Sequence, residues 1–302
     1  MKTIHIVEKT VPVAWEKAVI ACWEQGECFP TQYDRPDDPH SRDVTAMIRV
    51  TDPMSEPRIH RAFPGGLQDL EKYRAEIAYG VHDHWVAPEE GKWEYTYHQR
   101  LFEYAVPGLP GAINQIERCV EMLRECGFTR RAQAVTWKVW DDLGIHDPAC
   151  LQRLFFRIQH GKLNMTAHMR SNDAYKAAFM NMYAFVELQA HVAASVGVQV
   201  GEYCHIADSF HVYGSYSEEF QGFLKTVADR RPEDRVWNTS FAVDMFIEGC
   251  DGLLAEKDMP QDKQQLVRAR REDLLARRAG AGKKNSGSGK KVLTDHRNMV
   301  NL

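Results

Sequence analysis

Apolar residues recur at helical spacing in several parts of the chain. One apolar face near the N-terminus consists of Trp15, Val19, Cys22 and Trp23. The same period predicts further helices at residues 67–80, 112–127, 174–195, 216–228 and 266–278. Gly80 and Gly197 follow two of these stretches, and glycine readily ends a helix in the left-handed conformation. Residues 174–195 are strongly apolar and are predicted to lie in the core.

A different pattern, rich in β-branched and aromatic residues, predicts strands. These stretches are residues 44–51, 134–140, 151–159, 163–170 and 203–207. His160, Gly161 and Lys162 separate two of them by a short turn, which predicts an antiparallel pair. Residues 30–43, rich in Pro and Asp, are predicted to form a loop.

The C-terminal stretch has a different composition. Residues 279–291 are rich in Gly, Ser and Lys and carry too little apolar surface for a packed core. We therefore expect one domain at residues 1–278 and a flexible basic tail at residues 279–302. The lysines indicate a solvated linker more than a nucleic-acid arm, because no aromatic residues are interleaved for base stacking.

Composition excludes several classes of protein. With 302 residues, 44% hydrophobic and 26% charged, the chain is typical of a soluble globular protein. The apolar runs are shorter than the roughly 20 residues of a membrane span, so we expect a cytoplasmic protein without membrane partners. The seven cysteines are scattered without a CxxC, which predicts neither a disulfide framework nor a metal site. The net charge of −4 gives no reason to expect nucleic acid as a partner.

One cysteine has neighbours that suggest chemistry. Cys150 follows Pro148 and opens a predicted strand, so its thiol is placed at a sheet edge. A lone cysteine is more often a small buried apolar residue, and adjacent arginines are more often solvated. Here Arg130-Arg131 precede one strand and Arg170-Ser171 end another, so guanidinium groups able to bind a phosphate can converge beside the thiol.

Two further groups of polar residues have a structural and a functional interpretation. Asn172 or Asp173 can serve as a helix N-cap, or their segment can contact a ligand. His211 and Tyr213 alternate and face the same side of a strand. They form either a satisfied core pair or a joint contact to a sugar hydroxyl.

These residues, in this order, resemble the thymidylate synthase family. The match runs from Arg130 to Tyr213 without a gap, and its residues stand at the family's separations: Arg130, Arg131, Trp137, Pro148, Cys150, Arg170, Ser171, Asp173, Asn181, His211 and Tyr213. The segment from Tyr95 to His98 resembles the family's upstream tyrosine region. The resemblance implies an α+β fold with a mixed β-sheet flanked by helices, and a homodimer with stacked sheets and shared active sites.

The resemblance also implies a reaction between a pyrimidine nucleoside monophosphate and 5,10-methylenetetrahydrofolate, without a metal. Cys150 would attack C6 of the pyrimidine so that C5 accepts the one-carbon unit. The implied roles of the other residues are as follows: Arg170 and Ser171 bind the phosphate, Arg130 and Arg131 reach it from the partner subunit, Arg42 or Arg35 supplies a further phosphate arginine, His211 and Tyr213 hold the 3′-hydroxyl, Asp173 contacts the pterin, and Tyr97 assists removal of the C5 proton. Glu56, chosen over Glu76 on its distance from Tyr97, is the expected catalytic glutamate.

Asn181 bears on the choice of base. Its amide can donate to O4 and accept from N3–H of uracil, whereas the cytosine-specific relatives carry aspartate at this position. The simpler interpretation is that Asn181 satisfies a buried polar site. Together with Ser171, which favours deoxyribose, Asn181 indicates dUMP.

Several positions depart from the synthase pattern. His82-Asp83-His84-Trp85 stands where synthases have Trp-Asp-x-Trp, so His82 or His84 is expected to position a water and Trp85 to contact folate. Leu151, Phe155, Met169 and residues 176–178 also differ, on the folate side. We therefore expect a dUMP hydroxymethylase. The alternatives are a thymidylate synthase, a dCMP or CMP hydroxymethylase, and a catalytically silent nucleotide-binding or RNA-binding member of the family.

Overall fold

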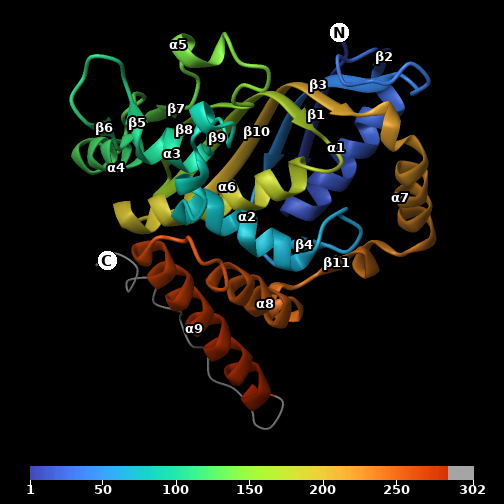
Figure 1. The fold of residues 1–302 in the computed structure, drawn as a ribbon. Coiled ribbons are helices and arrows are strands. Elements are labelled where there is room, and N and C mark those ends of the chain that lie inside the picture. The colour runs from blue at the N-terminus through green and yellow to red at the C-terminus, as the bar shows by residue number, and fades with distance from the viewer. Residues whose placement is uncertain (285–302) are drawn as a thin grey trace.

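The computed structural model describes residues 1–284 and contains a mixed sheet covered by helices (Figure 1). The α-helices are α1 Val11–Gln25, α2 Leu67–Tyr79, α3 Tyr97–Phe102, α4 Gln115–Glu125, α5 Val139–Asp142, α6 Ala178–Val196, α7 Ser217–Asp229, α8 Val243–Leu254 and α9 Gln261–Lys284. Short 3-10 helices are η1 Asp83–Trp85, η2 Pro88–Glu90, η3 Gly214–Tyr216, η4 Pro232–Arg235 and η5 Thr239–Phe241.

The main sheet has seven strands, in the order β1-β3-β10-β9-β8-β7 with β2 paired to β3. They are β1 Thr3–Glu8, β2 Glu27–Phe29, β3 Ser41–Val50, β7 Gln133–Val135, β8 Leu151–Gln159, β9 Lys162–Asp173 and β10 Gln199–Val212. β1 with β3 and β9 with β10 are parallel, and the other pairs are antiparallel. Two small sheets pair β4 Ile59–His60 with β11 Val236–Trp237, and β5 Tyr104–Ala105 with β6 Ala112–Ile113.

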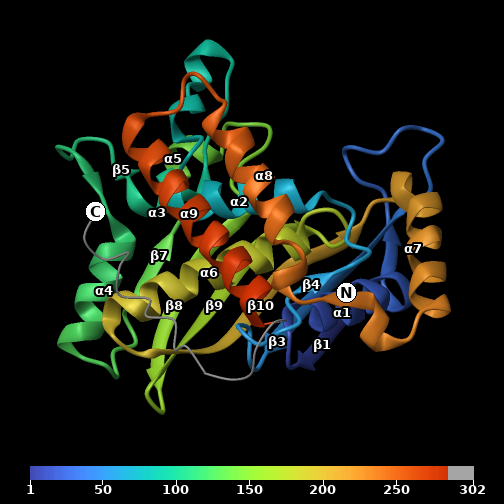
Figure 2. The same ribbon diagram turned by 90° about the horizontal axis from the view of Figure 1, so that it is seen from below.

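Helices cover one face of the sheet in successive layers. α1 and α6 contact the sheet, α2 packs on α6, α8 packs on α2, and α9 packs on α8. Figure 2, seen from below, shows α8 and α9 in front of α6. α6 is apolar around most of its circumference and is accordingly buried between the sheet and α2. The α+β fold with helices flanking a mixed sheet is confirmed.

The other face of the sheet keeps its side chains partly exposed. Along β10 the buried residues Tyr203, His205 and Ala207 alternate with the partly exposed Cys204 and Ile206. On β3, Met47 and Arg49 are exposed in the same alternation. This face therefore combines apolar and charged side chains on a broad, regular surface.

Several predicted elements are confirmed. Residues 151–159 form β8 as predicted, and the turn to β9 places His160 and Gly161 at positive φ, the conformation of a tight hairpin turn. Gly80 and Gly197 end α2 and α6 with φ of 64° and 86°. The predicted helices at residues 112–127 and 216–228 correspond to α4 and α7.

Other predictions needed correction. Of the stretch 134–140, only residues 134 and 135 lie in a strand, β7, and the chain then turns into α5. The strand predicted at 203–207 is the middle of β10, which is longer because β3 and β9 pair with both of its edges. The predicted loop ends at residue 40, and α6 begins at Ala178, after a turn. β1, α3 and α8 were not predicted.

The C-terminal helix is also longer than predicted. α9 continues to Lys284, so residues 279–284 of the expected tail are helical, and residues 285–302 lie outside the described part of the chain. None of the helices within residues 1–284 combines the length and apolar character that crossing a membrane requires.

Candidate active site

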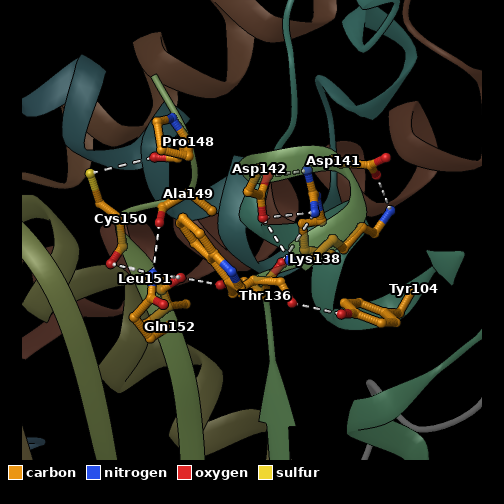
Figure 3. A network of polar contacts seen from close by, with 12 residues as sticks. Tyr104, Thr136, Lys138, Asp141, Asp142, Pro148, Ala149, Cys150, Leu151 and Gln152 are labelled. Atoms are coloured by element: carbon orange, nitrogen blue, oxygen red, sulfur yellow. Dashed lines mark hydrogen bonds and ion pairs between the residues drawn. The ribbon is translucent and has the colours of Figure 1, made fainter. Parts of the chain in front are cut away.

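Cys150 lies at the start of β8, where buried hydrogen bonds fix the backbone. The Thr136 hydroxyl donates to the Leu151 carbonyl, and the Thr136 amide donates to the Gln152 carbonyl at 3.0 Å. The Gln152 side chain donates to the Ala149 carbonyl at 2.8 Å. Figure 3 shows the Cys150 sulfur beside the Pro148 carbonyl, directed away from the network around Thr136 and Asp142. The thiol is therefore held at the edge of this network.

A buried ion pair supports the segment before Cys150. Arg100 of α3 and Asp142 of α5 are almost fully buried, with 2.9 Å between Arg100 Nη2 and Asp142 Oδ1. Arg100 also donates to the Thr136 carbonyl at 3.2 Å, and Asp142 accepts from the Lys138 amide at 2.6 Å. Each charge has a partner and further hydrogen bonds. Through Thr136, which bonds to Leu151 and Gln152, the pair links α3 to the start of β8 beside Cys150.

Arg170 approaches Cys150 from β9. Its amide donates to the Cys150 carbonyl at 2.8 Å, and its guanidinium donates to the carbonyls of Ala149 at 3.2 Å and Pro148 at 2.5 Å. Burial raises the pKa of the Cys150 thiol above its ordinary value, the Arg170 charge opposes that shift, and Asp147 adds to it. Arg170 therefore stabilises the thiolate without fully offsetting burial.

Three tyrosines surround a hollow of about 360 Å³ next to Cys150. The lining residues are Tyr73, Glu76, Trp93, Glu94, Tyr95, Thr96, Tyr97 and Asp147. Burial raises the pKa of Tyr73, Tyr95 and Tyr97, and a negative charge on Cys150 raises each further. The Tyr97 hydroxyl accepts from the Leu151 amide at 3.2 Å. The phenols therefore stay protonated, and they can donate to a ligand or water in the hollow.

Asn181 of α6 meets one of these tyrosines. Its side chain is 5% exposed, and its Oδ1 accepts a hydrogen bond from the Tyr73 hydroxyl. A carbonyl oxygen has two lone pairs, so Oδ1 can accept a second hydrogen bond, and Nδ2 can donate. Asn181 is thus the amide on α6 beside the hollow, with its orientation set by Tyr73.

His211 and Tyr213 lie together where β10 ends. Their rings are 4.6 Å apart between centroids, in edge-to-face contact. Burial lowers the pKa of His211 to about 4, so its ring is neutral at pH 7. Nδ1 lies 3.1 Å from the Ser209 hydroxyl, whereas Nε2 is buried and has no hydrogen-bond partner within residues 1–284. Such an unpaired nitrogen is expected where a ligand supplies the partner.

Asp173 is next to His211 across the β9–β10 register. Burial raises its pKa to about 6, against the opposing effect of hydrogen bonds from the amides of Lys176 and Tyr175. These bonds hold the turn that precedes α6, so the capping interpretation of this segment applies to the turn and not to the first residue of the helix. Ser171 is two residues earlier on the same face of β9 and pairs with Ser209.

Both candidate arginines of the N-terminal region lie toward this end of the sheet. Arg42 pairs with Val212 in the β3–β10 register, and its guanidinium is 5.4 Å from the Trp23 ring. Arg35 is exposed in the loop whose Tyr33 ring is 6.2 Å from that of Tyr213. The loop packs closely, because a Cβ on Gly214 would be 1.5 Å from the Pro39 carbonyl oxygen. The structure therefore leaves both arginines as candidates.

Arg130 and Arg131 are exposed between α4 and β7, at the edge of the sheet. Neither lines the hollow of its own chain. Both face solvent beside Phe128, which is 86% exposed. Their placement leaves them free to contact another molecule.

Glu56 is not among the residues that line the hollow. It is exposed, and its carboxylate accepts from the amides of Arg58 at 3.1 Å and Thr239 at 3.0 Å. Glu76 of α2 lines the hollow, one helical turn after Tyr73. The spacing of Tyr73 and Glu76 on one helix face was the signal in the sequence that places Glu76 beside the tyrosines.

His82 does not line the hollow but contacts Glu76, which does. His82 Nδ1 is 3.0 Å from Glu76 Oε2, and the imidazole stacks on Trp85 with centroids 4.0 Å apart. Trp93, which lines the hollow, meets both rings edge to face. His84 is directed to Asp258 instead, with 3.4 Å between Nε2 and Oδ2. The His82 segment is thus an aromatic and polar cluster beside Glu76.

A second group of hydrogen bonds joins this cluster to the tyrosine segment. Asp83 accepts from the Thr96 hydroxyl and is 2.5 Å from His98 Nδ1, and Thr96 caps the N-terminus of α3. Gly80 makes this possible, because a Cβ there would be 2.2 Å from His98 Nδ1. α2, η1 and α3 are therefore held together around the hollow.

A larger cavity of about 780 Å³ lies between α6, α8 and α9. Its arginines are paired with carboxylates, as in Arg58 with Glu187 at 2.7 Å and Arg278 with Asp244 at 3.1 Å. None of the predicted site residues lines it. We place the active site at the smaller hollow, because Tyr97 lines it and accepts a hydrogen bond from the amide of Leu151, the residue after Cys150.

Comparison with known proteins agrees with this geometry. Residues 66–272 match the family model described as thymidylate synthase. A protein of Methanocaldococcus jannaschii named "Putative thymidylate synthase" is 31% identical over 69% of this chain and 90% of its own, and one of Methanosarcina acetivorans with the same name is 28% identical over 72% and 94%. The thermostable thymidylate synthase A of Bacillus subtilis has a similar fold, with a TM-score of 0.56 and 20% identity over 70% of this chain and 82% of that one. The chain therefore belongs to the thymidylate synthase family.

Proposed function

We propose that the protein transfers a one-carbon unit from methylenetetrahydrofolate to C5 of dUMP and releases 5-hydroxymethyl-dUMP. The observation that carries this proposal is a tyrosine-lined hollow with Glu76 in its lining and His82 on Glu76, joined through Tyr97 to the backbone beside Cys150, which Arg170 also contacts. Family membership supports the one-carbon transfer. The polar pair of Glu76 and His82 supports water as the final nucleophile.

The first steps form a covalent adduct. The Cys150 thiolate adds to C6, and the electrons of the C5–C6 double bond move toward the C4 carbonyl. C5 then bonds to the methylene carbon of the folate as the methylene–N10 bond breaks and N10 takes up a proton. Loss of the C5 proton and cleavage of the methylene–N5 bond release tetrahydrofolate and leave an exocyclic methylene on C5. Tyr97 assists the proton loss by binding water, because its protonated phenol is a poor base.

Water completes the proposed reaction. Its oxygen bonds to the exocyclic methylene carbon and its proton passes to Glu76, which takes the role first expected of Glu56. The electrons return through the ring, the C5–C6 double bond forms again, and Cys150 leaves. Glu76 lines the hollow with a carboxylate oxygen not taken by His82, which fits a water-binding base.

The remaining site residues support nucleotide binding. We assign the phosphate to Arg170 and Ser171 with Arg42 or Arg35, the 3′-hydroxyl to His211 and Tyr213, and the pterin to Asp173 and Trp85. The unpaired His211 Nε2 suits a sugar hydroxyl. Asn181, oriented by Tyr73, offers the acceptor and donor that the O4 edge of uracil requires.

We also propose a homodimer that stacks the partly exposed faces of two sheets. The alternation of exposed apolar and charged residues on β3 and β10 supports a surface that is covered by a second copy. Exposed Arg130 and Arg131 at the sheet edge would then reach the partner's phosphate site. Sedimentation at micromolar concentration tests this, and a monomer with full activity contradicts it.

Reductive methylation to thymidylate is the second candidate. The stacked Trp85 and the neighbouring Trp93 favour it, because aromatic side chains near the methylene exclude water. The names of the relatives also favour it.

Product analysis separates the candidates. The protein is incubated with methylenetetrahydrofolate and dUMP, dCMP, UMP or CMP, and nucleotides are analysed by mass spectrometry while dihydrofolate is followed by absorbance. A hydroxymethyl product without dihydrofolate supports the proposal and identifies the base and sugar. Thymidylate with equal dihydrofolate establishes a synthase. Failure of 5-fluoro-dUMP and the folate to form an adduct on Cys150 indicates a catalytically silent binding protein.

A further inference from the structure

The connection between α8 and α9 contributes two carboxylates to the His82 cluster. Glu256 Oε2 is 3.4 Å from His82 Nε2, and Asp258 Oδ2 accepts from Trp85 Nε1 at 3.0 Å. These residues are far from His82 in the sequence, and the resemblance assigned them no role. The connection therefore meets the segment beside the active-site hollow at two points.

His82 is held between two carboxylates. Its Nδ1 faces Glu76 at 3.0 Å and its Nε2 faces Glu256 at 3.4 Å, and its side chain is 9% exposed. Apart from this contact, neither His82 Nε2 nor Glu256 Oε2 has a hydrogen-bond partner within residues 1–284. Trp85 stacks on one face of the imidazole, so the ring cannot rotate freely. Both ring nitrogens are thus engaged, which argues against His82 as the group that binds the attacking water.

We propose that Glu256 is a positioning residue that acts through His82 to fix the Glu76 carboxylate for the reaction at the hollow. A carboxylate at each nitrogen favours the charged imidazolium, which donates a hydrogen bond to Glu76 and forms an ion pair with Glu256. Its hydrogen bond to Glu76 Oε2 leaves the other Glu76 oxygen for water or substrate. This inference rests on the proposed function for its catalytic consequence.

The charges around His82 are consistent with this role. Burial opposes a charge on the imidazole, but hydrogen bonds and charges of Glu76 and Glu256 outweigh burial and raise the pKa of His82 above its ordinary value. The ionisable groups that face the ring are Glu76 from α2 and Glu256 from the α8–α9 connection, and the neighbouring Trp85 and Trp93 are uncharged. Asp83 is engaged by His98, and Asp258 by Trp85 and His84.

The test combines NMR and kinetics on Glu256→Gln. The matched control is Glu248→Gln, because Glu248 is an exposed carboxylate on α8 whose partner is Gln68, at 2.8 Å. The His82 ring signal is assigned with His82→Asn and followed against pH. In Glu256→Gln we expect the His82 midpoint to fall by about one pH unit, the acid-to-base profile of kcat to move in the same direction, and kcat at pH 7.5 to fall about tenfold with KM for the nucleotide unchanged.

The outcomes are separable. An unchanged His82 midpoint in Glu256→Gln overturns the contact, and a shifted midpoint with an unchanged kcat profile overturns its effect on the reaction. An equal effect of Glu248→Gln also overturns the proposal, because it would show a general charge effect. If wild-type protein forms neither product nor a 5-fluoro-dUMP adduct, the proposed function fails and the catalytic part of this inference fails with it, while the NMR result still decides the contact.

Discussion

The active site has two sides, and they are built in different ways. The sheet side, with Cys150, Arg170 and His211, is attached to adjacent strands of one sheet. The helix side, with Tyr73, Glu76, His82 and Tyr97, is attached to α2, α3 and the segment between them. On the sheet side, strand register sets which residues are neighbours, as for Asp173 beside His211.

The helix side depends on contacts between side chains that are distant in sequence. Asp83 holds Thr96 and His98, and the Glu256 carboxylate lies against His82. In a sheet, the spacing of two residues along a strand fixes the distance between them, whereas in a looped segment it does not. The residues expected on the sheet side lie on or beside adjacent strands, whereas Glu56, the expected glutamate, does not line the hollow.

Removal of the Cys150 thiol is expected to have the largest effect, on the sheet side. Cys150→Ala should lower kcat at least about 10⁴-fold, because it removes the nucleophile that forms the C6 bond in the proposed reaction. The Kd for dUMP, measured by calorimetry, should change less than about threefold, since Arg170 contacts the backbone and not the sulfur. Cys126→Ala, at the end of α4, is the control. Substantial activity in Cys150→Ala would refute the covalent scheme.

The two glutamates test the helix side. Glu76→Gln should lower kcat about 10²- to 10³-fold, because it removes the base in the hollow. Glu56→Gln should keep kcat within about twofold and lower the free energy of unfolding by about 1 kcal/mol, through weaker bonds to Thr239 and Arg58. Steady-state kinetics and urea unfolding measure both. The reverse ranking in kcat would restore Glu56 as the catalytic residue.

Base selectivity is expected to depend on Asn181, which lies between the two sides. Asn181→Asp should shift the ratio of kcat/KM for dUMP over dCMP by about 100-fold toward cytosine, because a carboxylate accepts from the ring amino group and repels O4. Competition between the two nucleotides in one assay measures the ratio. An unchanged ratio would show that Asn181 only satisfies a buried polar site.

Lowering the pH is expected to destabilise the fold through the buried histidines of the sheet side, and not through His82 of the helix side. Burial lowers the pKa of His205 to about 3 and of His211 to about 4, so both stabilise the fold above pH 6.5 and lose that contribution as pH falls. Asp173 has its pKa raised to about 6, so it takes up a proton more readily in the folded protein. It therefore adds to the free energy of unfolding as the pH falls through 6 and offsets part of the loss from the histidines. Together the three groups should lower the free energy of unfolding by about 2 kcal/mol from pH 7 to pH 5.

Urea unfolding at the two pH values measures this change. His82 should take up its proton at a higher pH than a free histidine and stay in contact with Glu76 as the pH falls, since its pKa is raised. A His211→Asn variant should lose part of the pH dependence. Stability that is constant or rises toward pH 5 would contradict the burial of neutral histidines.

The smallest effect is expected at the contact between the two sides. Tyr73→Phe removes the hydroxyl that orients the Asn181 amide and should lower the selectivity for dUMP over dCMP about fivefold, or about 1 kcal/mol. The competition assay again measures it, and Tyr79→Phe, on the same helix but outside the hollow, is the control. An equal loss in both variants would mean that Tyr73 acts only through packing.

The sequence by itself determined the family, the sheet side of the site and the elements that carry it. Arg170, Asp173 and His211 belong to regular strands and Cys150 directly precedes one, and their spacing is preserved because a strand advances by a constant rise per residue. The sequence also predicted the glycines at positive φ that end α2 and α6, since few other residues adopt that conformation.

The tertiary structure alone decided which carboxylate faces the hollow and what holds His82. Glu56 and Glu76 both precede Tyr97, but only the packing of α2 on α6 brings Glu76 to the hollow beside Asn181. Glu256 meets His82 because α8 packs on α2 and returns the chain across the His82 segment. Such contacts join residues far apart in sequence, and their positions depend on how whole helices pack, which no local pattern encodes.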